Sequence, residues 1–599
     1  MVLKTRQVSK PNSEPNSKLE QQDAEAIASR PKNSPKTESS SAATPSLRER
    51  LAQKRKAARL RKEITNFSLF SVFFAVMVGA PLAIVGGVKI AAAAVVGVLA
   101  LAFSIRYPWL ALWGFLIYLP FGGTITYMIG NSPLLQLAKD GLYLPGLFGI
   151  VQYCKRERLP LLIPKGLIPA IVILLFFCGL TLFGVNGYQE ILGDPDEKPF
   201  AMGILGLKVL LGYAPLVICA YYLLRTRADL LRLTRLMTVL AIACCSLGLV
   251  QYLLLLTGRC EGTRFAVGAD LFRATLDARC FVGGALVYSP QQNMIRLPGT
   301  FVAPWQWGWF LISNSFLIFP TAFNEPKFYW RIAGYVALGL IFVMAVVSGQ
   351  RIALALVPLA IGILLVFTGQ IVNLKRFIPV AIVLGVTLTG VALNNMATVE
   401  ERINSFISRW NASPPYAFIV EQMRWSLQEN WLLGHGLGRA TNSARALGET
   451  ELVETYYPKL IYEIGPWGTI AFLGVVTVLS FLCFKAYRSL RDPSLRGYGA
   501  AFWLFVLFIS YNTYYYPLDV DPVAVYYWFF AGVVLKLPQI EKQWQREALE
   551  ELAASQTDAK GKKGRSLQKK SHAPKPRGKP KLNSRRSSQQ TTASSPPSL

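Results

Sequence analysis

Residues 67–86 read FSLFSVFFAVMVGAPLAIVG and contain no charged side chain. A helix of about 20 apolar residues is long enough to cross the hydrocarbon core of a bilayer. The stretch KRKAARLRK (54–62) precedes this run. Basic residues in that position are typical of the cytoplasmic flank of a span, and they can also bind anionic lipid. Because the run begins behind a long basic tail, we expect it to stay in the membrane and not to be cleaved as a signal peptide.

The same apolar character continues along the chain. Of its 599 residues, 52% are hydrophobic and only 16% are charged, and the mean hydropathy is +0.35. These values are typical of a polytopic membrane protein and not of a soluble domain. We therefore expect an all-α fold of about 12–14 transmembrane helices. The fourteen candidate spans are 67–86, 88–105, 108–122, 139–153, 166–185, 202–224, 234–256, 305–323, 330–348, 351–368, 377–394, 466–486, 499–516 and 522–537, of which the second to fourth are the weakest.

The formal net charge of +29 invites comparison with nucleic-acid-binding proteins, but its distribution favours another explanation. Residues 1–65 carry 15 Lys and Arg against 7 Asp and Glu, and residues 538–599 carry 14 against 5. Both segments are rich in Ser, Pro, Lys and Gln, so we expect them to be disordered. We interpret them as basic cytoplasmic tails that flank a membrane domain at 66–537, and we expect no nucleic-acid partner.

The loops between the candidate spans alternate in charge. With the N-terminus in the cytoplasm, both termini and five basic loops fall on the cytoplasmic side. The basic loops are 154–165, 225–235, 324–331, 369–376 and 485–496. The loops 186–198 and 514–522 are acidic and fall outside. The alternation supports the predicted spans independently of their length.

Two long loops, at about 257–304 and 395–465, also fall outside, and they contain many arginines but a single lysine, Lys459. A guanidinium group binds phosphate or carboxylate through two parallel hydrogen bonds. We expect at least two of these arginines to bind an anionic ligand, although pairing with Asp and Glu of the same loops is the alternative. The arginines are Arg259, Arg264, Arg273, Arg279, Arg296, Arg402, Arg409, Arg424, Arg439 and Arg445.

Cys260 and Cys280 lie in the first long loop, whereas the other six cysteines lie in or beside candidate spans. A disulfide between them would close a loop of 19 intervening residues and stabilise it by roughly 3 kcal/mol. Two unpaired structural thiols are the alternative. The sequence shows no P-loop, dinucleotide-binding fingerprint or CxxC metal pair, so we expect no cofactor and no metal.

Four segments resemble, in order, motifs of the O-antigen ligase and polymerase superfamily of integral membrane proteins. That family's R-x-x-G-T-F segment is similar to RLPGTFVAPWQWGWFL (296–311), and its S-x-S-R to SGQR (348–351). Its glycine-rich turn is similar to NWLLGHGLG (430–438). Its H-N-x-Y-L-x-x-h-x-E-x-G segment is similar to ETYYPKLIYEIGPWG (454–468). The resemblance covers roughly residues 200–480.

The resemblance implies a metal-independent glycosyltransferase of the bacterial inner membrane. Such an enzyme moves a glycan from a polyprenyl diphosphate carrier to a hydroxyl of an acceptor glycan or lipid, in polymerisation or ligation of a surface polysaccharide. Cations would neutralise the leaving diphosphate. We expect Arg351 and Arg296 to do so, with Arg424 and Arg409 as further substrate-binding residues. The alternatives are that Arg351 extends to the lipid headgroups and that Arg424 is a solvated residue of an amphipathic helix at 418–431.

The chain departs from the family at the candidate catalytic histidine, which aligns with Glu454. Glu454 could act as the base if its pKa were raised, and His435 could reach the same space. A third possibility is that arginines position the diphosphate and no strong base is needed. Glu463 could orient an arginine or cap a helix. We expect GHGLG around His435 to be a tight turn with positive φ and close packing, and not a phosphate-binding loop.

Two other functions fit a large helical membrane protein. A transporter of a small anion or saccharide would have ionisable residues in the middle of its spans. The sequence places few there, with Asp140 and Lys208 near the starts of two spans. A non-catalytic component of a polysaccharide export assembly would explain the long tails, which could bind other assembly proteins.

Overall fold

The computed structural model describes residues 47–570, with gaps at 130–138, 162–163, 269–270, 272–274, 276, 291–293, 373–384, 386–399, 401–403, 405–406, 409, 413 and 429–431. The chain divides into two units, Met1–Met77 and Val78–Leu599. Residues 47–77 form the first part of helix α2 (Leu47–Arg106), whose backbone departs from helical geometry at Gly87. The remaining elements all belong to the second unit.

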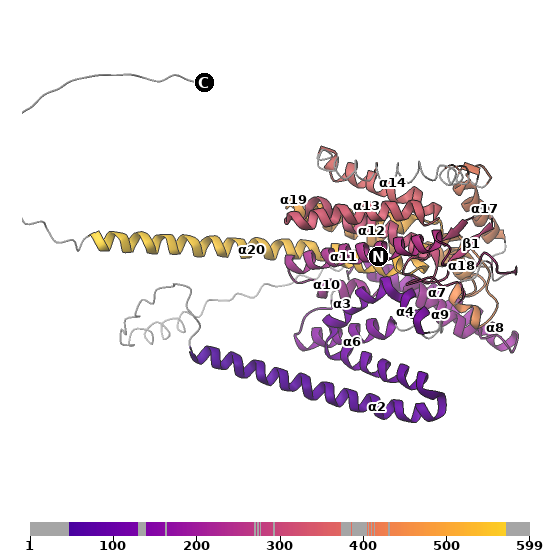
Figure 1. The fold of residues 1–599 in the computed structure, drawn as a ribbon, viewed down its shortest axis with the longest axis horizontal. Coiled ribbons are helices and arrows are strands. Elements are labelled where there is room, and N and C mark those ends of the chain that lie inside the picture. The colour runs from indigo at the N-terminus through magenta and orange to yellow at the C-terminus, as the bar shows by residue number, and fades with distance from the viewer. Residues whose placement is uncertain are drawn as a thin grey trace, which may run out of the picture. The chain divides into compact units, whose positions relative to one another are not determined.

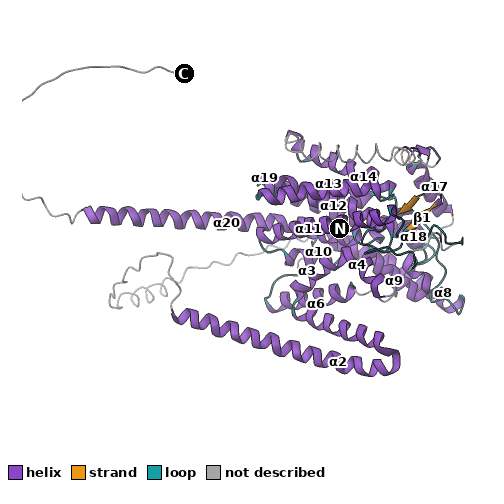
Figure 2. Ribbon diagram, viewed as in Figure 1, coloured by secondary structure: helices purple, strands orange, loops and turns teal. Residues whose placement is uncertain are grey.

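Helices make up almost all of the described secondary structure, which confirms the all-α prediction (Figures 1 and 2). The α-helices after α2 are α3 (Pro108–Tyr118), α4 (Gly122–Ile129), α6 (Asp140–Arg156), α7 (Leu167–Thr181), α8 (Gly187–Leu192), α9 (Pro199–Leu211), α10 (Leu216–Leu223), α11 (Arg227–Leu256), α12 (Pro304–Asn324), α13 (Phe328–Val347), α14 (Arg351–Phe367), α17 (Pro415–Gln428), α18 (Tyr456–Arg488), α19 (Pro493–Tyr511) and α20 (Val523–Lys570). Short helical turns are η1 (Leu119–Phe121), η2 (Leu182–Asn186), η6 (Asn442–Ala446) and η7 (Pro517–Asp519). The described strands β1 (Val287–Ser289) and β2 (Met294–Arg296) form an antiparallel hairpin.

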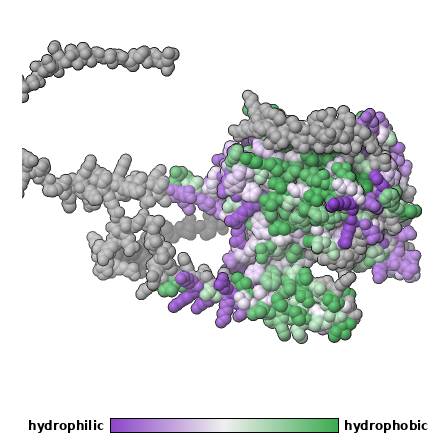
Figure 3. Space-filling model, in the orientation of Figure 1, coloured by the Kyte–Doolittle hydropathy of each residue, from purple (hydrophilic) through white to green (hydrophobic). Residues whose placement is uncertain are grey.

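Nine helical segments within the described residues are long and apolar enough to cross a membrane. They are Arg61–Ile84, Pro108–Met128, Leu167–Leu192, Pro199–Leu223, Arg227–Leu256, Phe328–Val347, Tyr456–Arg488, Pro493–Tyr511 and Val523–Ala553. Every predicted span coincides with a described helix except 377–394, which lies almost wholly outside the described residues. A hydrophobic band covers the visible face of the helical bundle, with hydrophilic residues toward its ends (Figure 3). The chain is therefore a multi-pass membrane protein.

Helix α12 lies at the centre of the bundle. It packs against α11, α13, α14, α19 and α20, and almost every residue along its length is buried. Its buried face includes Ser313, Asn314 and Thr321. Asn314 donates to the Phe310 carbonyl at 2.9 Å, whereas the Ser313 and Thr321 hydroxyls have no hydrogen-bond partner among the described residues. A helix surrounded by other helices needs no lipid-facing apolar surface, so it can carry polar residues. This explains why α12 is less apolar than the nine segments named above.

One end of the bundle gathers the basic loops, and we call it the basic end. The Tyr222 hydroxyl donates to the Pro160 carbonyl, which joins the loop 154–165 to the start of the loop 225–235. Arg235 pairs with the buried Glu325, and Ser494 donates to the Asn324 carbonyl 3.1 Å away. These contacts bring four of the five predicted basic loops to the same end. The fifth, 369–376, lies partly outside the described residues.

The opposite end carries both long loops, and we call it the loop end. The Thr124 amide donates to the Thr300 carbonyl (3.1 Å), and the Lys198 amide donates to the Leu447 carbonyl (2.8 Å). The Tyr456 amide donates to the Thr513 carbonyl (2.7 Å). The predicted alternation of loops between two ends is thus present. That the basic end faces the cytoplasm stays a prediction.

The described part of each predicted tail is helical and not disordered. Helix α2 begins at Leu47, and α20 continues without interruption to Lys570. These stretches consist largely of Ala, Leu, Glu, Gln, Lys and Arg, which have high helix propensity, and Gln543 and Glu547 form an i,i+4 hydrogen bond. Residues 1–46 and 571–599 lie outside the described residues.

Candidate functional site

The segment that follows Arg296 is fixed by hydrogen bonds to Pro120 and to Gln251. The Thr300 hydroxyl donates to the Pro120 carbonyl at 2.6 Å. The fully buried Gln251 of α11 accepts from the Gly299 amide at 3.1 Å and donates to the Cys280 carbonyl at 2.9 Å. A buried amide with both ends satisfied makes the turn rigid.

A disulfide joins Cys260 and Cys280, which confirms the predicted pairing. The segment that follows Cys280 packs against the same turn, because the Gly284 amide donates to the Phe301 carbonyl at 2.8 Å. The other six cysteines are free and buried. The disulfide therefore anchors, at Cys280, a segment that packs against the residues following Arg296.

Arg296 lies at the end of β2, half-buried, within electrostatic range of Glu454 and Tyr515. Its Nη2 donates to the Ser289 hydroxyl at 3.2 Å, and its Nε is buried without a hydrogen-bond partner among the described residues. Burial lowers the pKa of the Arg296 guanidinium, while Tyr515 and the Glu454 carboxylate act in the opposite direction. The guanidinium thus retains donor capacity for an anionic or hydroxyl-bearing ligand.

Glu454 is held in place by its backbone. Its amide donates to the Gln422 side chain on α17 at 3.2 Å, and its carbonyl accepts from the Tyr515 amide at 3.1 Å. The side chain is half-buried. The structure therefore places Arg296 and Glu454, two predicted site residues from segments far apart in the chain, within electrostatic range of each other but without a direct ion pair.

Arg351 begins α14 in a segment that adjoins β2. The Leu297 amide donates to the Ser348 carbonyl at 3.0 Å, and Gly349 lies against Met294. The Arg351 side chain is half-buried at the loop end. Its segment and that of Arg296 thus lie side by side, and its role in diphosphate binding stays a prediction.

The GHGLG stretch is a tight turn, as predicted. Gly434, Gly436 and Gly438 have φ of 74°, 116° and 83°. Asn186 of η2 holds the turn with both ends of its amide, donating to the Leu437 carbonyl (3.0 Å) and accepting from the Leu437 amide (2.9 Å). The glycines are needed for positive φ and for close approach of neighbouring backbone.

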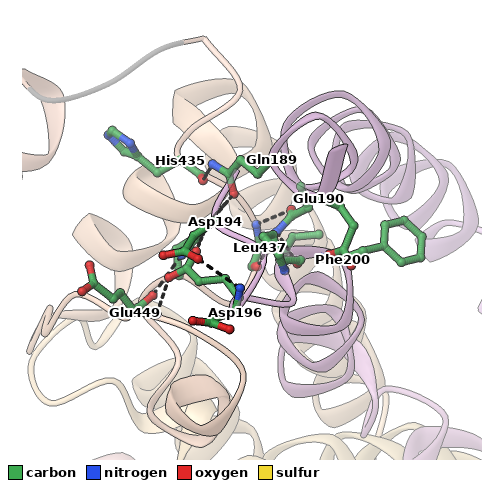
Figure 4. Close-up of polar contacts among 12 residues, drawn as sticks. Gln189, Glu190, Asp194, Asp196, Phe200, His435, Leu437 and Glu449 are labelled. Atoms are coloured by element: carbon green, nitrogen blue, oxygen red, sulfur yellow. Dashed lines mark hydrogen bonds and ion pairs between the residues drawn. The ribbon is translucent and has the colours of Figure 1, made fainter. Parts of the chain in front are cut away.

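The His435 imidazole stacks on the Tyr462 ring with 4.5 Å between centroids, and Tyr462 stacks in turn on Trp425. Figure 4 shows the imidazole pointing away from Asp194 and Glu449, while the His435 carbonyl accepts from Gln189 at 2.9 Å. The stack gives His435 a packing role. A catalytic role for His435 stays a prediction.

The acidic loop 186–198 also holds the GHGLG turn and the residues that follow it. Arg439 pairs with Glu197 at 2.8 Å and donates to Gln189, and the Glu449 amide donates to Glu197 at 2.7 Å. The Arg439 hydrogen bond lowers the pKa of Glu197. This arginine is paired with a carboxylate of the loop 186–198 and not, as the alternative expected, with one of its own loop.

Glu463 orients a loop and a lysine, where the sequence led us to expect an arginine or a helix cap. Its Oε1 accepts from the Ala440 amide (2.9 Å) and from the Thr441 hydroxyl (2.8 Å). Its Oε2 lies 3.8 Å from Lys459 Nζ. The expectation was wrong about the partner because Lys459 is one helical turn away on the same helix, α18.

Arg424 is exposed on α17, along a shallow surface groove that includes Val420, Met423 and Leu427. An amphipathic helix with this composition fits the predicted position at the membrane surface. Arg409 lies outside the described residues, as do Arg273 and Arg402.

An apolar groove of about 390 Å³ lies between α17, α18 and the end of α19. It is lined by Met423, Tyr457, Ile461, Pro466, Thr469, Ile470, Leu473, Tyr511 and Thr513. Three of these residues, Met423, Tyr457 and Thr513, lie within three positions of Gln422, Glu454 and Tyr515 in the chain. The groove therefore lies on segments that adjoin Glu454 in the chain.

A second cavity of about 330 Å³ lies at the loop end, which we call the lysine cavity. Its wall contains Lys139, Lys208 and Lys459, together with Phe301–Ala303 of the Arg296 segment and Tyr516, the residue after Tyr515. Burial raises the pKa of Tyr516 to about 12, and the Glu454 carboxylate adds to this increase. The lysine cavity is thus a neighbour of the Arg296–Glu454 pair.

Each lysine of the lysine cavity is paired with a carboxylate. Lys139 pairs with Asp521, and Lys459 with Asp519. Lys208 lies 2.8 Å from Asp140. This cluster was not predicted from the sequence, although the acidic loop 514–522, the lone Lys459 and the charges at 140 and 208 were its visible signals. Within the described residues, no group of three or more His, Cys, Asp or Glu is arranged to hold a metal ion.

Two comparisons of this chain with known proteins, one against family models and one against curated proteins, gave no match. The resemblance to the O-antigen ligase and polymerase superfamily therefore rests on the four motifs alone.

Proposed function

We propose that this protein transfers a saccharide from a polyprenyl diphosphate carrier to an acceptor hydroxyl, in polymerisation or ligation of a bacterial surface polysaccharide. The observation that supports the proposal is the apolar groove between α17, α18 and α19, whose lining includes Tyr457, three residues after Glu454. A lipid-linked substrate needs an apolar path for its chain and cationic donors where the chain meets the headgroup. The lysine cavity next to Arg296 and Glu454 supplies space for the sugar.

The reaction balances without a cofactor. The acceptor oxygen attacks the anomeric carbon of the donor sugar and forms the new glycosidic bond. The bond from that carbon to the diphosphate oxygen breaks, and both of its electrons leave with the polyprenyl diphosphate. The hydroxyl proton passes to Glu454 or to the leaving diphosphate. Arg296, joined by Arg351, would stabilise the developing negative charge.

The proposal is tested by the length distribution of surface and lipid-linked glycan in a gene-deletion strain. The deletion should accumulate short lipid-linked glycan, and the wild-type gene should restore long chains. Arg296→Ala should fail to restore them at normal protein levels. The control is Arg264→Ala, an exposed arginine of the same loop that lies over the Tyr288 ring. Full restoration by Arg296→Ala would remove Arg296 from the mechanism.

A transporter is the second candidate, favoured by the buried ion pairs of the lysine cavity. Lys459 is 2% exposed within a membrane-spanning helix. Buried ionisable pairs in such helices often mark ion or substrate paths. If the deletion strain loses uptake of a small anion or saccharide while its glycan lengths are unchanged, the transferase proposal is wrong and the transporter is favoured.

A further inference from the structure

The lysine cavity is a polar chamber in which every lysine is already paired with a carboxylate. The side chains of its three ion pairs are between 2% and 32% exposed. Glu463, which lies behind Lys459, adds a fourth carboxylate and is satisfied by Ala440 and Thr441. The group therefore has three cations and four anions.

This balance disfavours a strongly anionic occupant. A diphosphate or a uronate would have to break an existing Lys–Asp pair and leave the aspartate buried beside it without compensation. Removing one partner from a buried pair typically costs about 3–5 kcal/mol. A cationic sugar that bound one of the aspartates would likewise have to break a Lys–Asp pair and leave the lysine without a partner.

The rest of the wall suits an uncharged, hydroxylated ligand. Tyr118, Tyr213, Trp305 and Tyr516 contribute aromatic rings. Thr126, Gln306, Thr441, Asn442 and Ser443 contribute hydroxyl and amide groups. Rings pack against the apolar faces of a sugar, and fixed polar groups bind its hydroxyls. The volume lies near the lower end of the range for small-molecule sites, so the chamber fits a short saccharide and not a long chain.

We propose that the lysine cavity is a binding subsite for a neutral saccharide unit and that its paired lysines select against acidic sugars. The inference rests on the proposed function, because it names the class of sugar that the transferase accepts. The diphosphate would bind at Arg296 and not at the lysines.

The test measures binding alone, so its outcome is separate from that of glycosyl transfer. Full-length protein in lipid nanodiscs is titrated with three probes, and binding is followed by saturation-transfer NMR. The probes are the neutral oligosaccharides released by mild acid from the surface polysaccharide of cells that carry this protein, a glucuronic acid disaccharide, and inorganic pyrophosphate. Variants are accepted only if their melting temperature stays near that of the wild type.

We expect the neutral oligosaccharides to bind the wild-type protein and the glucuronic acid disaccharide to bind at least about tenfold more weakly. Trp305→Ala removes a partly exposed ring from the cavity wall and should weaken neutral binding by about tenfold. Asp521→Asn leaves Lys139 without its partner and should improve binding of the acidic disaccharide. Glu451→Gln, a change of an exposed carboxylate outside the cavity, should change neither.

Two results would overturn the inference. One is that no neutral oligosaccharide binds, or that Trp305→Ala binds as tightly as the wild type. The other is pyrophosphate binding that is lost in Lys139→Met and Lys459→Met but retained in Arg296→Ala. Neither result decides the proposed transfer reaction, which has its own test. In the second case, the diphosphate would occupy the lysine cavity.

Discussion

Gly434 and Gly465 pack backbone against backbone where α18 is interrupted. A Cβ atom on Gly434 would lie 2.7 Å from Gly465 N, and one on Gly465 would lie 3.0 Å from Gly434 N. Gly465 has φ of 70° and precedes Pro466, which has no amide to continue the helical ladder. The GHGLG turn thus packs into the break in α18. This packing fixes the loop that carries Ala440 and Thr441.

Gly465→Ala should destabilise the protein by about 2 kcal/mol or more, because the methyl group meets backbone and the φ is strained. The measurement is the melting temperature of the purified protein in detergent. Gly474→Ala is the matched control, since Gly474 lies in the same helix and a methyl group there would meet no described atom within 4 Å. An equal melting temperature for the two variants would show that the contact is not tight.

Gln251→Leu should destabilise the loop end by roughly 2–4 kcal/mol, because the Gly299 amide and the Cys280 carbonyl both lose a buried partner. The melting temperature and the restoration of long glycan chains should both decrease, since the same turn leads to Arg296. Leu253→Ala, a change of an exposed side chain on the same helix, serves as the control. Unchanged stability of Gln251→Leu would mean that the two hydrogen bonds contribute little.

Removing the disulfide should cost roughly 3 kcal/mol through the entropy of the opened loop. The double variant Cys260→Ser/Cys280→Ser should melt at a lower temperature, and reductant should lower the melting temperature of the wild type only. Peptide mapping without reductant should recover the Cys260–Cys280 linkage. Recovery of both thiols in free form would contradict the pairing.

The Glu197–Arg439 pair should make stability depend on acid pH. The pKa of Glu197 is lowered in the folded protein, so its contribution is fully present above its unfolded value of about 4.5 and is lost as the pH falls through the folded pKa. The difference in melting temperature between wild type and Glu197→Gln should therefore shrink on acidification below that range. Because Glu197 is only half-buried, we expect a small effect. A difference that is constant across acid pH would exclude this linkage.

The spans and their alternation could be predicted from the sequence because both are local properties. Twenty apolar residues or a cluster of Lys and Arg can be recognised without knowing what lies beside them. The helical extension of α20 beyond 538 was missed because polar composition was interpreted as disorder, although the same residues favour helix.

The pairing of charges across the lysine cavity could not be predicted in the same way. Lys139 and Asp521 are 382 positions apart, and each alone resembles an ordinary residue at the end of a span. Only the packing of α6 and α18 with the loop before α20 brings such pairs together. Arg296 and Glu454 were selected because the motif resemblance places them in recognisable segments, and their proximity was not foreseen.

The most direct test of the proposed function is glycosyl transfer by the purified protein. The donor is lipid-linked oligosaccharide isolated from the deletion strain, in nanodiscs, and the measured quantity is the rate of polyprenyl diphosphate release with growth of the glycan. We predict release by the wild-type protein and a rate lower by about 10²–10⁴ in Glu454→Gln, the range for loss of a general base. No release by wild-type protein from a donor that membranes of the parent strain consume would contradict the proposed transfer reaction.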